Sequence, residues 1–191
     1  MAVTTVERAS AIIGWMFEGW ENYYLMIGSS AGALIGLMFV VVTLTAGRDR
    51  AELERGKHLY TSPIVWHLAV ILTLSGAAAV PKMSTKIFGI AALGLAILGF
   101  GWGIRSAVGI ARRPGAPDAA GFDMFWYGLA PAIVYVGLGV AAFGTLSAAA
   151  WGTTAIAAAL MALLLVSIHA EWDLVTYLAP IAGQPPPDRQ P

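Results

Sequence analysis

Three ionisable residues stand close together near the end of the last long apolar run of this chain. In the stretch SIHAEWDLVTYL, residues 167–178, His169, Glu171 and Asp173 follow about twenty uncharged residues. An imidazole and two carboxyls can exchange protons or pair with cations. On a helix, His169 and Asp173 share one side, whereas Glu171 falls on an apolar side with Leu174. A carboxyl is costly in contact with lipid, so we expect the side chain of Glu171 to point into the protein.

Ionisable residues also occur at the corresponding ends of three other apolar runs. Ser62 followed by Pro63 is typical of a helix start, which places His67 about one turn inside its run. Arg105 lies near the end of the next run, and Asp123 opens the one after it. If all these runs cross a membrane, the groups share one layer about 10 Å thick, at 1.5 Å per residue. The predicted inner polar layer comprises His67, Arg105, Asp123, His169, Glu171 and Asp173.

Alternative interpretations of this layer remain open. Ionisable groups near a membrane boundary can reach the headgroups, and His169 can pair with Asp173 on a wetted helix end. In a functional layer, Glu171 would pair with Arg105, because both lie at one depth. His67 and His169 at like depth could also bracket a haem. Histidines at such positions more often form hydrogen bonds in the packed core or lie at the membrane interface than bind haem, so we predict no cofactor.

The elements that must position these groups are membrane helices. Charged residues make up 12% of the chain and hydrophobic residues 58%, whereas soluble domains carry about 25% charge. Apolar runs of about twenty residues suffice to cross a bilayer as helices. The sequence therefore predicts an all-α integral membrane bundle of about five transmembrane helices, at roughly 23–46, 63–81, 87–110, 123–145 and 150–170.

The segments on either side of the bundle differ from it in character. At 100° per residue, one face of the N-terminal segment is apolar and the other carries Glu18 and Glu21, which predicts an amphipathic interfacial helix. The tail GQPPPDRQP is typical of a disordered end. We predict an interfacial helix at 1–22, the bundle at 23–180 and a disordered tail at 181–191.

The distribution of basic residues predicts the orientation. Two loops on one side hold most of them, at Arg48, Arg50, Arg55, Lys57, Arg112 and Arg113. Because basic loops stay in the cytoplasm, the N-terminus is expected outside and the C-terminus inside. The expected location is the plasma membrane, that is, the inner membrane of a bacterium.

Small residues recur at helical spacing in two runs. Gly28, Gly32 and Gly36 lie four apart, as do Gly99 and Gly103. Such seams let helix backbones approach closely. Packing within the bundle is the simpler interpretation, and a homo-oligomer interface is the alternative. Pro131, within the fourth run, is expected to kink its helix.

Composition excludes several kinds of chemistry. The chain has no cysteine, which rules out thiolate metal sites, iron–sulfur clusters and thiol redox reactions. Its formal net charge is zero, without a basic stripe for nucleic acid. No catalytic residue or metal site is predicted, and the sequence favours a non-enzymatic role. The predicted function is a channel or transporter with a polar inner vestibule. The alternative is a non-transporting subunit that packs against itself or another membrane protein through its small-residue faces.

Overall fold

The computed structural model describes residues 19–45, 62–112 and 124–182. Within these ranges the chain forms five α-helices and one short π-helical segment, η2. They are α2 (Glu21–Thr45), α4 (Ser62–Ala78), α5 (Thr85–Ala111), η2 (Phe125–Leu129), α7 (Ala130–Leu146) and α8 (Gly152–Ala182). By length and composition, four of the helices can cross a membrane, and the fifth, α4, is a shorter apolar helix. The all-α, five-helix bundle predicted from the sequence is confirmed.

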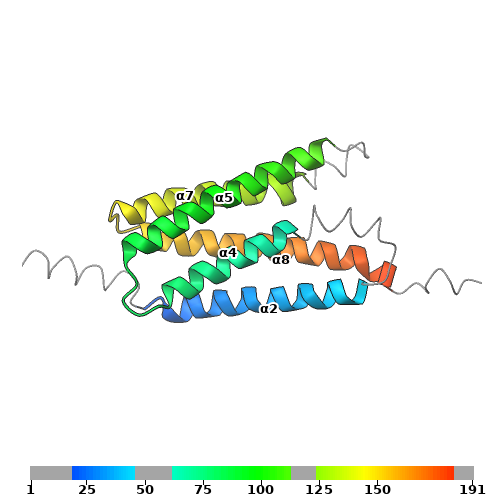
Figure 1. The fold of residues 1–191 in the computed structure, drawn as a ribbon, viewed down its shortest axis with the longest axis horizontal. Helices are drawn as coiled ribbons and strands as arrows, with labels where there is room; N and C mark the ends of the chain where they lie inside the picture. The colour runs from blue at the N-terminus through cyan, green and yellow to red at the C-terminus, as the bar shows by residue number, and fades with distance from the viewer. Residues whose placement is uncertain (1–18, 46–61, 113–123, 183–191) are drawn as a thin grey trace, which may run out of the picture.

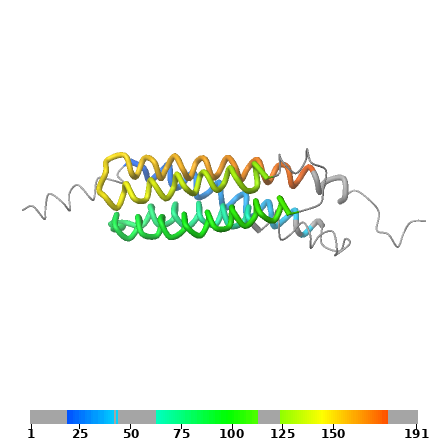
Figure 2. Tube along the Cα trace, turned by 90° about the horizontal axis from the view of Figure 1, so that it is seen from above, coloured from blue at the N-terminus to red at the C-terminus, as the bar shows by residue number. Residues whose placement is uncertain are grey.

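The helices lie side by side along one direction (Figures 1 and 2). In chain order, α2, α5 and α8 run one way, while α4 and α7 run the other (Figure 1). α5 packs on α7, α7 on α8, and α2 on α4, while α4 and α8 also contact each other. We call the end with Arg105 and Arg112 the arginine end. The end with Lys82 and Lys86 is the lysine end.

Large apolar side chains fill the half of the bundle near the lysine end. Tyr24, Ile27 and Phe88 are buried there, and the rings of Tyr24 and Phe88 meet edge to face at 6.5 Å. The Tyr23 hydroxyl donates to the carbonyl of Ala157 at 2.6 Å, which ties the start of α2 to α8. This half is therefore a closely packed apolar core.

Two of the predicted boundaries change. The last helix extends to Ala182, well past the expected end at 170, so SIHAEWDLVTYL continues the helix. α2 begins at Glu21, so residues 21 and 22 belong to the first long helix. Gly19 and Trp20 precede α2 and are not helical, while residues 1–18 of the predicted interfacial helix and most of the tail lie outside the described residues.

Pro131 has its effect through the turn that precedes it. Proline has no N–H, so the carbonyl of Tyr127, four residues earlier, lacks its usual α-helical hydrogen bond. The chain widens there into the π-helical segment, in which the N–H of Ala130 donates to the carbonyl of Phe125. The sequence located the irregularity correctly. Its form is a wide turn at the start of α7.

The glycine seams divide into two kinds. A methyl group added at Gly99 would overlap the ring of Tyr135, and one at Gly103 would lie 3.2 Å from the Ala132 Cβ. A methyl group added at Gly28 would lie 3.0 Å from the Cβ of Ser75. These three are contacts within the bundle. Gly32 and Gly36, in contrast, are exposed, with no atom within 4 Å of an added methyl group.

Candidate functional site

A buried polar pair joins α4 to α7. The Nδ1 atom of His67 lies 2.8 Å from the Tyr135 hydroxyl, and both residues are almost fully buried. Gly99 on α5 makes room for the tyrosine ring. Because imidazole and phenol each have both a donor and an acceptor form, the pair can pass a proton in either direction. Sequence analysis found His67 and missed Tyr135, although the small residue Gly99 was a signal that something large packs there.

Glu171 lies on the core face of α8. Its exposed fraction is 3%, and Ser167, Ala170 and Leu174 on the same face are buried too. Neither carboxyl oxygen has a hydrogen-bond partner within the described parts of the chain. The hydroxyl of Ser167, one turn away, already donates to the carbonyl of Leu163. Glu171 thus faces inward as the sequence indicated, but without the expected partner.

The predicted ion pair between Glu171 and Arg105 does not form. Arg105 is exposed on the outside of α5, where it lines an open hollow. α8 packs on α2, α4 and α7 rather than on α5. Equal depth in the membrane therefore did not make the two residues neighbours, because their helices occupy different positions around the bundle.

His169 and Asp173 face the start of the fourth span. The ring of His169 lies against Trp126, with centroids 3.9 Å apart. The hydroxyl of Tyr127 donates to Asp173 Oδ2 at 2.9 Å and contacts the carbonyl of Ala170 at 3.3 Å. The π-helical segment supplies both aromatic residues. This cluster fixes α8 to η2 near the arginine end and leaves Asp173 half-buried.

The structure thus separates the predicted polar layer into three environments. His67 and Glu171 are buried, His169 and Asp173 are half-buried against η2, and Arg105 is on the outer surface. Asp123 lies outside the described residues. Among the described residues, no group of three or more His, Asp or Glu side chains could hold a metal ion.

The fold and this site define a class, the multi-pass helical membrane proteins with ionisable groups buried in one half of the bundle. Comparison of the chain with protein-family models, with curated proteins and with solved structures finds no match. The function therefore has to be argued from the geometry.

Proposed function

We propose that this membrane protein transports protons or a small monovalent cation, and that Glu171 is the group that binds the transported ion. The observation behind the proposal is the burial of Glu171 without a hydrogen-bond partner among the described residues. Burying a polar group without a partner costs about 1–3 kcal/mol. In membrane bundles, inward-facing ionisable groups are typical of ion pathways and proton relays. A buried carboxyl without a protein partner can bind a transported cation and release it again.

The neighbouring polar groups support movement of a proton through this half. Asp173 and His169 lie half-buried toward the arginine end of α8. His67 on α4 and Tyr135 on α7 form a hydrogen-bonded pair that can exchange a proton, and both helices pack on α8. Uptake at Glu171 from the arginine end and onward transfer through the His67–Tyr135 pair is the route that we propose.

The packing of the other half favours a transporter over an open channel. Tyr24, Ile27, Phe88 and Ile156 are completely or almost completely buried near the lysine end. A continuous water path does not fit through a core filled by these side chains. The structure then corresponds to a state closed toward the lysine end, and transport requires a change of helix packing.

Ion flux into vesicles tests this proposal. Protein reconstituted in liposomes is expected to dissipate an imposed proton or cation gradient. A pH-sensitive dye trapped in the liposomes measures the proton flux, and a cation-sensitive dye measures the cation flux. Glu171→Gln keeps the shape and removes the ionisable group, so flux should fall at least about tenfold. Glu21→Gln, at an exposed carboxyl at the start of α2, is the matched control and should retain most of the flux. Wild-type vesicles as tight as empty ones would overturn transport as the function.

A second candidate function, a subunit or accessory protein of a membrane complex, rests on a different observation. Gly32 and Gly36 are exposed on α2 with open space above them, next to the exposed side chains of Leu37, Phe39 and Val40. Small residues on a lipid-facing surface permit close approach of another helix. This candidate predicts association without flux.

A further inference from the structure

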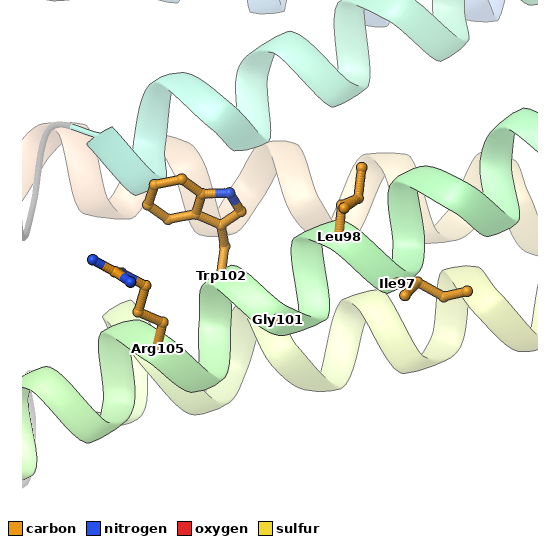
Figure 3. Close-up of a pocket in the computed structure, with 5 residues that line it drawn as sticks. All are labelled: Ile97, Leu98, Gly101, Trp102 and Arg105. Atoms are coloured by element: carbon orange, nitrogen blue, oxygen red, sulfur yellow. The ribbon is translucent and has the colours of Figure 1, made fainter.

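A hollow of about 550 Å³ lies on the outside of the bundle, between the start of α4 and the last turns of α5. Pro63 of α4 lines one wall, and Trp102, Ser106 and Arg112 belong to the α5 wall. An adjoining hollow of about 540 Å³ shares Arg105, Trp102 and Gly101 and continues along α5 to Ile97 and Leu98. Figure 3 shows Trp102 and Arg105 extending from α5, with Leu98 further along the same helix. The two hollows form one groove with a basic end and an apolar end.

The basic end of this groove carries two exposed cations, Arg105 and Arg112. Arg105 and Arg112 are seven residues apart, which places them on the same side of α5 about 10 Å apart along its axis. Both are exposed, and neither forms an ion pair with any residue of the described chain. An anion that lies between two guanidinium groups is held by charge-assisted hydrogen bonds.

The first turn of α4 adds to the positive potential of the basic end. Pro63, at the start of α4, lines the hollow together with Arg105 and Arg112. A helix start carries the positive end of the helix dipole and N–H groups that lack intrahelical acceptors, which favours an anion in this space.

The depth of the groove matches the level of lipid phosphates. Lys86 and Arg105 are nineteen residues apart on α5, or about 28 Å at 1.5 Å per residue. That distance nearly equals the roughly 30 Å thickness of the hydrocarbon core. Arg105 thus lies at one boundary of the core and Arg112 in the headgroup region beyond it. The stacked rings of Trp66 and Trp102, 6.3 Å apart, lie beside Arg105, where aromatic residues are typical of the interface.

The apolar end has the lining for the first part of a hydrocarbon chain. Ile97 and Leu98 are exposed, and Gly101 leaves open space, with nothing within 4 Å of an added methyl group. From Leu98 to Arg105 the groove follows α5 for about 10 Å. Its two ends therefore suit the two parts of one amphiphile, a charged head and an acyl chain.

We propose that this groove binds an anionic phospholipid of the leaflet at the arginine end. The phosphate lies between Arg105 and Arg112, beside the start of α4, and one acyl chain lies over Gly101 and Leu98. Basic pockets between membrane helices bind phospholipid headgroups by this chemistry. The site is separate from Glu171, so the proposal does not depend on transport.

Native mass spectrometry of the purified protein with equal amounts of phosphatidylglycerol and phosphatidylcholine tests the proposal. The wild type should retain phosphatidylglycerol preferentially. Arg105→Gln combined with Arg112→Gln should weaken that preference roughly thirtyfold, which corresponds to about 1 kcal/mol for each arginine. Gly101→Leu fills the apolar end and should reduce retention of both lipids without disturbing any packed neighbour.

Each variant has a matched control toward the lysine end. Lys82→Gln combined with Lys86→Gln removes two exposed cations at the lysine end, and Gly94→Leu fills open space one heptad from Gly101. Both controls should behave like the wild type. Retention that survives both groove variants, or that falls equally in the controls, overturns the proposal. Displacement of the lipid by excess soluble glycerol phosphate does so too, because the site would then bind a soluble phosphate compound. If the double arginine variant does not fold, Gly101→Leu decides alone.

Discussion

At the scale of single residues, two buried polar sites, the His67–Tyr135 pair and Glu171, are in opposite situations. Tyr135 and His67 satisfy each other at 2.8 Å, whereas the Glu171 carboxyl has no such partner in the described part of the chain. A satisfied buried pair stabilises the fold, while an unsatisfied group lowers the free energy of unfolding. The two sites should therefore respond to mutation with opposite signs.

Glu171→Met, which replaces the carboxyl by an apolar side chain of similar length, should raise the free energy of unfolding by about 1–3 kcal/mol. Tyr135→Phe should lower it, because His67 then loses its partner. Thermal unfolding in one detergent measures both. A clear loss of stability in Glu171→Met would mean that the carboxyl has a stabilising partner after all. The ion pair with Arg105 that the sequence suggested would have predicted such a loss of stability. Without that pair, we expect a gain.

The residue scale also shows what a helical projection can and cannot predict. The projection placed Glu171 on the inner face of its helix, because Leu174, Val175 and Leu178 fall on the same side. It could not show which helix lies opposite, and the pairing with Arg105 failed for that reason. Tyr135 was missed because a tyrosine in an apolar run differs from its neighbours only by one hydroxyl.

At the scale of elements, the two glycine series have different roles despite identical spacing. Gly99 and Gly103 hold α5 close to α7, whereas Gly32 and Gly36 lie on the outer face of α2. Spacing alone predicts that a helix can be approached closely, but not whether the approaching helix belongs to the same chain. The limits of each helix were predictable to within a few residues, except at the end of α8.

Gly32→Ile tests whether the outer face of α2 joins protomers. A Cβ at position 32 has no atom of the described residues within 4 Å, so the protein should fold normally. If protomers associate through this face, the species in mild detergent should shift toward monomer, as measured by size-exclusion chromatography with light scattering. Gly94→Ile on α5 is the control, and Gly99→Ile, which overlaps the Tyr135 ring, should fail to fold. An oligomer that is unchanged by Gly32→Ile would exclude this face.

At the scale of the whole molecule, the chain enters the bundle at one end and leaves it at the other (Figure 1). The described residues therefore cross the bundle an odd number of times, in agreement with the five apolar runs of the sequence. The bias of arginine and lysine in the loops then predicts that the arginine end faces the cytoplasm.

A reporter fused after Pro191 tests this orientation in cells. A fluorescent protein, which folds in the cytoplasm, should be active there, and alkaline phosphatase, which needs an oxidising compartment, should be inactive. The same pair of reporters fused before Met1 should give the reverse result. Phosphatase activity at the C-terminus would place the arginine end outside and assign the groove on α5 to the other leaflet.

The short length of α4 has a consequence for the membrane itself. Its 17 residues span about 25 Å, while the 27 residues of α5 beside it span about 40 Å. Val65 and Leu72 show that α4 is exposed on its outer side. Lipids that touch α4 must shorten by about 5 Å to match it, at a cost of fractions of a kcal/mol per Å of hydrophobic mismatch. The bilayer around this protein is then thinner on one flank than on the other, and membranes rich in shorter acyl chains should accommodate it best.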